Sequence, residues 1–371
     1  MVPAPLRGAL NMTEIFWRDH YLWLKERGYQ LRPRYSPDWV PSWHGTKKYF
    51  MDCEDGRSLG FTQVNDAIHL PTGRHVALKK VYKTVNPFEE DITRLFSSEP
   101  LTKDPRNHCV PLLDVLQLPS NETEEEEVSL FVLPFLRVFN SPIFDTFGEA
   151  LDCIRQLFEG LQFMHENHVA HRDINYTNFM MEPETMFPDG YHPKEILRKP
   201  DLSGKAKFYT RTQNPPRYHL IDFGLSRQYD ASDVSPLEPV ILGGDDTVPE
   251  FKEPEKPQNP FQTDVYCAGN LVRTQFIEGH PVLTSFRGYR GFEFLKPLID
   301  DMVQDDPTKR PKMDDVLRRF DDVVKGLSAW KLRSRTSSRR ANIFQDIKHS
   351  FWHWRRKFTF IIKRTAAIPH P

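Results

Sequence analysis

Cysteine is scarce in this chain of 371 residues. The four cysteines, Cys53, Cys109, Cys153 and Cys267, lie far apart and form no Cys-x-x-Cys pair. Because paired spacings mark disulfide frameworks and zinc sites, the sequence indicates neither. Isolated thiols suit a reducing compartment, which favours the cytoplasm, with the nucleus as the second option.

Long apolar runs are also missing. No stretch contains 18 consecutive apolar residues, the length at which a membrane-spanning helix is considered. The N-terminus has no extended apolar segment after its first basic residue, Arg7, as a secretion signal would have. We therefore expect an intracellular protein without a transmembrane segment.

The net charge of −1 hides an uneven distribution. From Lys331 to the end there are eleven Lys and Arg residues against one acid, Asp346, which gives +10. The rest of the chain holds 39 basic and 50 acidic residues, which gives −11. The tail also contains F-W-H-W at 351–354 and F-T-F-I-I at 358–362. Such a segment can bind an anionic membrane or a nucleic acid, or can pack on the domain as a helix with a solvated basic face.

Two motifs contain the residues that we consider as candidates for catalysis and metal binding. Residues 171–178 read H-R-D-I-N-Y-T-N, and residues 222–224 read D-F-G. In phosphoryl-transfer sites this pattern places a carboxylate, here Asp173, at an incoming hydroxyl, and metal-binding oxygens at Asn178 and Asp222. Each motif alone is short, and a lone D-F-G is usually an ordinary turn. Their occurrence in this order along the chain makes a phosphoryl-transfer site a stronger prediction than either motif alone.

Further landmarks accompany these motifs. V-A-L-K at 76–79 alternates as a half-buried strand should and follows a P-T-G turn. Downstream stand V-P-E at 248–250, D-V-Y-C-A-G at 264–269 and D-P-T-K-R-P at 306–311. In this order the landmarks resemble the eukaryotic protein kinase superfamily. The aromatic N-terminal block and F-P-D-G-Y-H-P at 187–193 look like its divergent fungal kinase-like families.

The resemblance implies an α+β, two-lobed protein-kinase-like fold. We expect an aromatic N-terminal extension at 1–50, packed on a small lobe at 51–136 with a β-sheet and one helix. A larger, mainly helical lobe would cover 137–326, with a long polar insert at about 182–216, and 327–371 would form the basic tail. Helical spacing of apolar residues predicts a short helix over 12–27 and a strongly buried one over 147–165. The acidic run 122–127 is expected to be a solvated hairpin turn.

The resemblance also implies ATP and Mg²⁺ as cofactors and a protein substrate. Asp173 would be the base that positions the acceptor hydroxyl, and Lys79 would hold the α- and β-phosphates. Asn178 and Asp222 would bind the metal. Leu133 would be the residue ahead of the adenine-binding segment. The remaining nucleotide contacts would come from Val64, Ala77, Pro134, Leu136 and Met180.

Several positions depart from the family pattern. Alignment places the three glycines of the phosphate-covering loop on Arg57, Leu59 and Thr62, with Gly56 and Gly60 one residue away. Glycines are used in such a loop because backbone N–H groups must approach phosphate closely. The loop is therefore expected to bind nucleotide weakly.

The helix of the small lobe and the catalytic loop also depart from the pattern. Asn86, followed by Pro87, predicts a capped helix start. The resemblance then makes Asp91, with Glu90 beside it, the acidic partner of the lysine. Asn175 stands where serine/threonine kinases carry a lysine that neutralises the transferring phosphate, and Thr177 where many tyrosine kinases carry an arginine.

Two interactions in the larger lobe follow from the resemblance. Glu250 and Arg310 would form a buried ion pair. Arg172 would receive a phosphate from the segment after D-F-G, although Asp245 and Asp246 already supply negative charge there, so little dependence on phosphorylation is expected. The acceptors in that segment are Ser226, Tyr229, Ser232, Ser235 and Thr247.

Two classes of function follow. The first is an active protein kinase that transfers the γ-phosphate of ATP to a protein hydroxyl. The second is a pseudokinase that acts as a binding or scaffold module, which the missing glycines, Asn175 and Asp91 favour. A small-molecule kinase ranks third, because those enzymes resemble H-G-D where this chain reads H-R-D.

Overall fold

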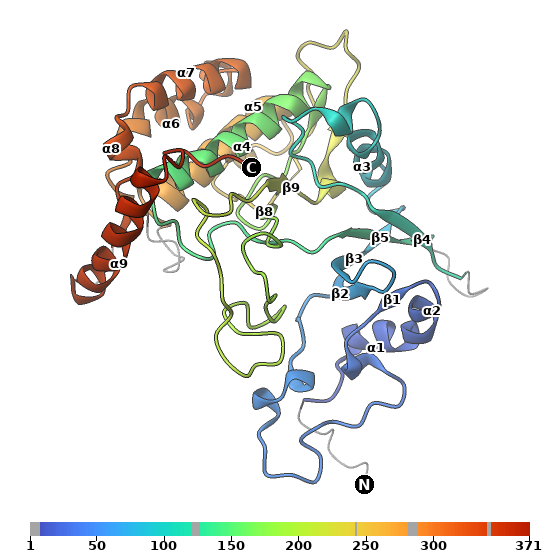
Figure 1. The fold of residues 1–371 in the computed structure, drawn as a ribbon. Coiled ribbons are helices and arrows are strands. Elements are labelled where there is room, and N and C mark those ends of the chain that lie inside the picture. The colour runs from blue at the N-terminus through green and yellow to red at the C-terminus, as the bar shows by residue number, and fades with distance from the viewer. Residues whose placement is uncertain (1–7, 120–126, 242, 281–287, 340–342) are drawn as a thin grey trace. The chain divides into compact units, whose positions relative to one another are not determined.

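The computed structural model describes residues 8–119, 127–241, 243–280, 288–339 and 343–371, and only the backbone of 343–352. The acidic run predicted as a hairpin turn lies almost wholly outside these residues. The described chain is a mixed α+β structure with antiparallel sheets (Figure 1). It forms two compact units. Unit 1 comprises Met1–Val85, Pro111–Leu136 and Pro183–Tyr209, and unit 2 comprises Asn86–Val110, Arg137–Glu182 and Thr210–Pro371.

This division differs from the expected lobes in two places. Residues 86–110, including the helix expected in the small lobe, belong to unit 2. Residues 183–209 of the insert belong to unit 1. Both differences arise because contacts between segments distant in the sequence determine which unit residues 86–110 and 183–209 pack on.

Unit 1 contains a five-stranded sheet in the order β1-β2-β3-β5-β4. Its strands are β1 (Tyr29–Gln30), β2 (Val64–His69), β3 (Arg74–Tyr82), β4 (Asp114–Gln117) and β5 (Val128–Pro134). The β2–β3 hairpin turns at Gly73, whose φ of 68° is readily adopted by glycine, as the P-T-G motif predicts. Ala77 pairs with Asp66 and with Leu133 across the two neighbouring strands.

The N-terminal block packs on this sheet, as predicted. The expected helix over 12–27 is present as α1 (Met12–Asp19) and α2 (Tyr21–Glu26), which meet at His20. Asn11 begins α1 with a capping box to Glu14. The aromatic and aliphatic side chains of the block share one buried cluster with those of the sheet, which contains Trp17, Leu24, Tyr29, Leu31, Tyr35, Ala67, Val76, Leu78, Leu130 and Val132.

The insert is not the polar loop that its composition predicts. In its unit 1 part Met186, Phe187, Tyr191 and His192 are all buried. Tyr191 contacts the Phe187 ring at 5.0 Å between centroids and the Phe135 ring at 6.1 Å. The insert therefore contains a buried apolar group, although its Gly and Pro residues are typical of a solvated turn.

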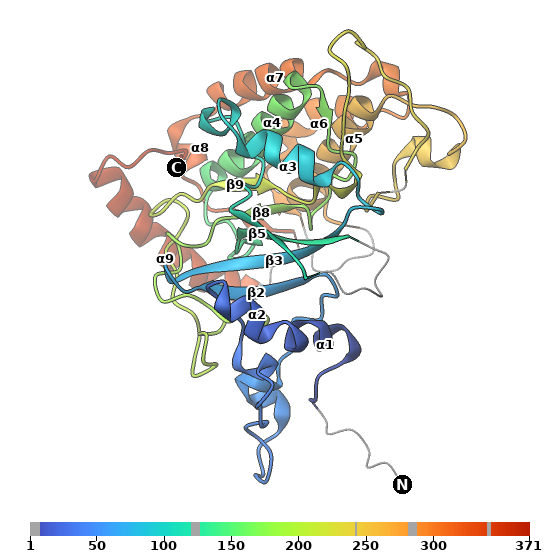
Figure 2. The same ribbon diagram turned by 90° about the vertical axis from the view of Figure 1, so that its right-hand side faces the viewer.

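Unit 2 is built around α4 (Phe147–Glu166), the helix predicted over 147–165. It packs against α5 (Pro260–Val272) and α7 (Met313–Lys325), and α5 packs on α6 (Lys296–Met302) (Figures 1 and 2). The remaining helices are α3 (Glu89–Ser97), α8 (Ala329–Leu332) and α9 (Ile343–Ile362).

Short strands complete unit 2. A three-stranded sheet has the order β6 (Arg137–Val138), β8 (Phe179–Met181), β9 (Tyr218–Leu220). Two further pairs are β7 (Val169–Ala170) with β10 (Arg227–Gln228), and β11 (Tyr289–Arg290) with β12 (Ser337–Ser338). The predicted helix start at Asn86 is wrong. The helix begins at Glu89 without a side-chain cap, and the Asn86 amide instead donates to the Gly224 carbonyl at 3.0 Å.

Candidate active site

The H-R-D loop lies between β7 and β8 in unit 2, and Asp264 of α5 fixes its backbone. The two carboxylate oxygens of Asp264 accept the N–H groups of His171 and Arg172 at 2.8 Å and 2.7 Å. One of them also contacts His165 Nε2 at 3.0 Å. Asp264 is fully buried, so these hydrogen bonds satisfy a charge that would otherwise be costly. In the sequence Asp264 is only the first residue of the D-V-Y-C-A-G motif, whereas in the structure it positions the backbone of the H-R-D loop.

Two residues of the motifs adopt a left-handed backbone. Arg172 has φ 68°, and Asp222 has φ 66° and ψ 75°. Neither is glycine, and such conformations persist where surrounding contacts hold them, commonly at functional sites. At Arg172 the contact is its own N–H bond to Asp264.

Asn175, Asn178 and Gly244 hold the Asp173 carboxylate. Asn178 Nδ2 donates to its Oδ2 at 2.8 Å, and Asn175 Nδ2 donates to its Oδ1 at 3.0 Å. The backbone N–H of Gly244 donates to the same Oδ1 at 2.6 Å. A Cβ on Gly244 would lie 2.6 Å from Asn175 Nδ2, so a side chain here would displace the Asn175 amide. Sequence reasoning singled out Asp173 and Asn178 but missed Gly244.

The β8–β9 pair brings the two predicted metal ligands to the same end of a sheet. Asn178 precedes β8 and Asp222 lies two residues after β9, and the Ile221 N–H donates to the Asn178 carbonyl at 3.0 Å. His171 Nδ1 accepts the Asp173 N–H, so His171 Nε2 carries the proton that it donates to the Ile221 carbonyl at 3.1 Å. Met180 pairs with His219 in β9 and is half-buried.

The donor chemistry fits Mg²⁺. Asn178 directs its amide nitrogen to Asp173, which leaves the amide oxygen with a contact of 3.3 Å to the Thr177 hydroxyl. Asp222 supplies carboxylate oxygens, and hard oxygen donors of these two kinds are what Mg²⁺ takes from proteins. Within the described residues no group of three or more His, Cys, Asp and Glu is arranged for a metal.

On α3 the buried carboxylate is not the expected one. Asp91 is exposed, and Glu90 pairs with Arg94 on the helix surface. Glu89 is 3% exposed. The choice of Asp91 relied on its place just ahead of the apolar stripe. Glu89, however, precedes Ile92 by three residues and Phe96 by seven, so it shares their buried face.

Of the predicted nucleotide contacts, five lie in unit 1. Val64 pairs with Lys79 across β2 and β3, and Lys79 also pairs with Phe131 of β5. The next residue, Lys80, points to the other face, where its ammonium lies 4.5 Å from the Phe16 ring centre. Ala77 occupies the middle of β3, and Pro134 ends β5.

Beyond β5 the chain stays ordered by contacts within unit 1. Leu136 is buried, and Phe135 stacks on His75 with ring centres 3.9 Å apart. The Phe135 N–H also donates to the His75 carbonyl at 3.4 Å. The segment predicted to contact adenine is therefore held on its β3 side by an aromatic stack.

The insert binds the segment that stands in place of the glycine-rich loop. Arg57 pairs with Glu195 at 2.5 Å, and Lys194 Nζ donates to the Leu59 carbonyl at 3.1 Å. Gly56 serves packing rather than phosphate, because a Cβ there would lie 1.9 Å from the Phe50 carbonyl oxygen. The insert therefore holds this segment through the Arg57 side chain and the Leu59 backbone.

Arg172 has an acidic partner that the sequence did not identify. Arg172 Nη1 lies 3.0 Å from Glu238 Oε2, and the other oxygen of Glu238 accepts from Arg227 at 2.8 Å. Asp245, one of the two acids expected to supply negative charge near the end of the segment after D-F-G, accepts a hydrogen bond from Asn270 at 2.6 Å. Glu238 lies 66 residues after Arg172 in the sequence, so no local sequence signal could have predicted this ion pair.

The expected buried ion pair is confirmed. Arg310 donates to both carboxylate oxygens of Glu250, at 2.6 Å and 2.7 Å, and both side chains are almost fully buried. Arg310 also donates to the backbone carbonyls of Gln304 and Gln262. This pair links the segment after D-F-G to the end of the D-P-T-K-R-P motif.

Comparison with known proteins finds no family model that matches the chain and no curated protein that matches it. Among the described helices none is both long and apolar enough to cross a membrane.

Proposed function

We propose that this chain is an ATP- and Mg²⁺-dependent protein kinase with a two-lobed kinase-like fold. The observation that carries the proposal is the hydrogen-bonded loop in which Asn178 and Asn175 orient Asp173 while the β8–β9 pair sets Asn178 beside Ile221 and Asp222. A carboxylate held in this way is positioned to accept a proton from an alcohol.

In this proposal each site residue has the role that the kinase pattern gives to its position. Asp173 orients the acceptor hydroxyl and takes its proton, and Lys79 binds the α- and β-phosphates of ATP. Asn178 and Asp222 hold Mg²⁺, which neutralises phosphate charge when bound. The Arg172–Glu238 pair keeps the loop beside Asp173 in place without an added phosphate. Ser226 cannot serve as a regulatory acceptor while it is buried with its hydroxyl bonded to the His171 carbonyl.

A pseudokinase is the second candidate, and one observation favours it. The segment that would cover the phosphates carries Arg57 and Leu59, and Glu195 and Lys194 of the insert bind it. A loop bound in this way offers fewer backbone N–H groups to a nucleotide than a glycine-rich loop. In this role the surface of the protein, rather than phosphoryl transfer, would be its function.

Labelling with radioactive γ-phosphate from magnesium ATP separates the two candidates. A kinase that lacks the lysine and the glycine loop should transfer phosphate to itself or to a generic basic substrate at well below about one per second. Asp173→Asn should abolish the labelling without lowering the melting temperature. Equal labelling by both proteins, with no magnesium-dependent nucleotide binding, would favour the pseudokinase.

A gain-of-function variant sharpens this test. Asn175→Lys restores the missing ammonium beside Asp173 and should raise the labelling rate by about tenfold or more, because it adds a charge that stabilises the transferring phosphate. Ile143→Lys adds the same charge at an exposed position of unit 2 outside the loop, so it is the matched control and should leave the rate unchanged. A rate that stays at background in Asn175→Lys would count against catalysis.

A further inference from the structure

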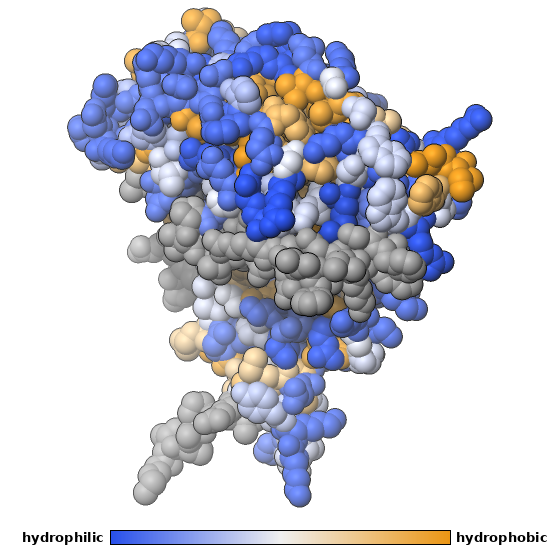
Figure 3. Space-filling view, turned by 90° about the vertical axis from the view of Figure 1, so that its left-hand side faces the viewer, coloured by the Kyte–Doolittle hydropathy of each residue, from blue (hydrophilic) through white to orange (hydrophobic). Residues whose placement is uncertain are grey.

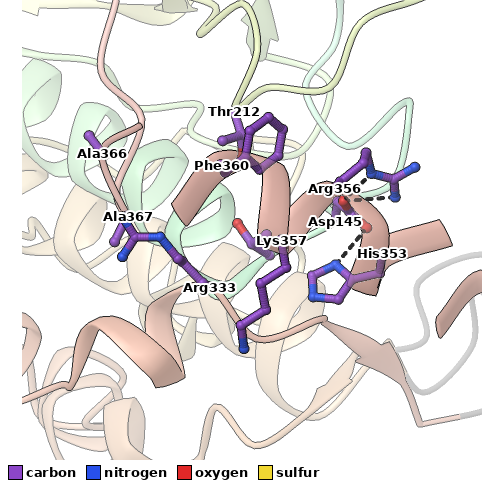
Figure 4. Close-up of a pocket in the computed structure, with 10 residues that line it drawn as sticks. Asp145, Thr212, Arg333, His353, Arg356, Lys357, Phe360, Ala366 and Ala367 are labelled. Carbon is purple, nitrogen blue, oxygen red and sulfur yellow. Dashed lines mark hydrogen bonds and ion pairs between the residues drawn. The ribbon is translucent and has the colours of Figure 1, made fainter. Parts of the chain in front are cut away.

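Helix α9 is attached to unit 2 by its polar side. His353 and Lys357, one helical turn apart, are both 4% exposed. His353 and Arg356 both contact Asp145, at 3.4 Å and 2.8 Å (Figure 4). The Lys357 ammonium lies 3.5 Å from the ring centre of Trp330. From His353 onward, the part of α9 whose side chains are described, the buried contacts of the helix are thus made mainly by basic residues.

The described part of α9 also exposes apolar side chains to solvent. We call Trp354, Phe358, Ile361 and Ile362, together with Trp330 of α8, the outer stripe. These side chains are between 41% and 80% exposed. The four residues of α9 follow the i, i+4, i+7, i+8 spacing of a continuous helical face. Hydrophobic atoms form small groups on a mainly hydrophilic face in the space-filling view (Figure 3).

Over residues 353–362 this arrangement differs from an ordinary surface helix, which buries its apolar stripe and exposes its charges. Aromatic contacts hold the outer stripe together, with ring centres 5.8 Å apart both between Trp330 and Trp354 and between Trp354 and Phe358. A connected, exposed apolar group of this kind marks an interaction site.

The chain after α9 holds the helix in this orientation. Arg333 donates to the Thr365 carbonyl at 2.6 Å, and His370 contacts Asp152 of α4 at 3.2 Å. The Ala367 carbonyl packs so closely on α4 that a Cβ at Gly148 would lie 1.9 Å from its oxygen. With contacts within the helix and after it, the helix cannot turn its apolar side chains inward without breaking them.

We propose that the outer stripe docks on the surface of an anionic lipid bilayer. Three exposed cations, Arg355, Lys363 and Arg364, accompany the stripe, and no acidic residue follows Asp346. Amphipathic helices with aromatic and aliphatic residues on one face and basic residues beside it lie in the lipid headgroup region. The described helices offer no membrane span, so the attachment is peripheral. This proposal is independent of phosphoryl transfer.

Charge distinguishes this occupant from a second copy of the chain. A symmetric contact through the stripe would bring two identical sets of cations together, which is repulsive, whereas an anionic surface neutralises them. Nucleic acid would neutralise the cations as well, but the aliphatic side chains of Ile361 and Ile362 gain nothing from phosphates or base stacking. Lipid is the surface that uses both the apolar and the basic residues.

Vesicle sedimentation of the full chain tests the proposal. Binding should occur to phosphatidylcholine vesicles that contain phosphatidylserine, should weaken with added salt, and should be small with phosphatidylcholine alone. Replacing Lys363 and Arg364 by Ala should weaken binding by about fivefold for each cation removed. Tryptophan fluorescence should shift to shorter wavelength on binding because Trp354 enters the bilayer.

A stripe variant isolates the apolar contribution. Phe358→Ser, Ile361→Ser and Ile362→Ser combined keep every cation and should lower the partition coefficient by at least about tenfold. The control combines Ile143→Ser, Val234→Ser and Leu237→Ser, which removes three other exposed apolar side chains of unit 2 and should change nothing. Equal melting temperatures would establish that each variant folds.

Several outcomes would overturn the proposal. One is absence of vesicle binding by the intact protein at low salt, and another is full binding by the stripe variant. Stripe-dependent dimers in sedimentation equilibrium would assign the face to a second copy of the chain. Stripe-dependent RNA binding in the absence of vesicle binding would assign it to nucleic acid.

Discussion

At the residue scale, the Glu250–Arg310 pair shows why a buried ion pair needs both partners. Its two charges are almost completely removed from water. Each satisfies the other, while Arg310 also donates to backbone carbonyls and Glu250 also accepts from the Thr263 hydroxyl. Removing one partner leaves the other charge buried without compensation, which costs more than the pair contributes.

Glu250→Ala should therefore lower the free energy of unfolding by about 3 kcal/mol, measured by urea denaturation. Asp315→Ala breaks an exposed pair with Arg318 and serves as the control, with an expected loss below about 1 kcal/mol. If the two variants were equally stable, the buried pair would not form in solution.

Asp152 of α4 links stability to pH. Burial raises the pKa of Asp152 to about 6, against the opposing effect of hydrogen bonds from Gln156 and His370. Since the folded-state pKa lies above the unfolded value, the folded state holds the proton more tightly. The stabilising contribution is complete below about pH 4 and is lost as the pH rises through about 6.

Asp152→Asn should therefore flatten the stability profile between pH 4 and pH 7, with a difference of up to about 3 kcal/mol across that range. Thermal melts at a series of pH values measure this. Asp322→Asn, an exposed carboxylate on α7, is the control and should leave the profile as in the wild type. A profile for Asp152→Asn that parallels the wild type would contradict the assignment.

At the scale of elements, the insert 183–209 is a packed part of unit 1 rather than a connection. Its apolar side chains contact one another and Phe135, and its charged side chains bind the segment 57–59. Its residues lack helical or strand periodicity, so packing rather than backbone pattern keeps it folded.

Two tyrosines of the insert provide a matched comparison. Tyr191 is 6% exposed, whereas Tyr209 is 44% exposed. Tyr191→Ala should lower the free energy of unfolding of unit 1 by about 3 kcal/mol, because it leaves a cavity beside Phe135 and Phe187. Tyr209→Ala should cost less than about 1 kcal/mol. Equal, small effects in urea denaturation would mean that the insert is a solvated loop after all.

At the scale of the whole molecule, thiol protection reports on both units. All four cysteines are free and buried, Cys53 in unit 1 and the other three in unit 2. Burial raises the pKa of the Cys109, Cys153 and Cys267 thiols, which disfavours the reactive thiolate.

We expect a thiol reagent to modify the native protein at least about 100-fold more slowly than the denatured protein. Along a denaturant series, mass spectrometry of labelled peptides would show whether Cys53 becomes reactive before or together with the three thiols of unit 2. A reducing agent should leave the melting temperature unchanged. Rapid labelling of all four thiols in the absence of denaturant would contradict their burial.

Local features of the sequence determined much of the secondary structure. The apolar period of 147–166 specified α4, alternation and a P-T-G turn specified the β2–β3 hairpin, and the spacing of the thiols excluded disulfides. The order of the motifs also pointed to the residues that meet in the H-R-D loop. These features were predictable because they depend on neighbours within a few residues or on a motif that is itself contiguous.

Tertiary structure decided the features that join distant segments. It placed Glu238 beside Arg172 and packed the insert on unit 1. It also turned the apolar face of α9 outward, which a helical period cannot reveal because the period identifies a face but not what covers it. Each of these outcomes depends on contacts between side chains that are tens of residues apart in the sequence. Composition and the spacing of neighbouring residues do not determine such contacts.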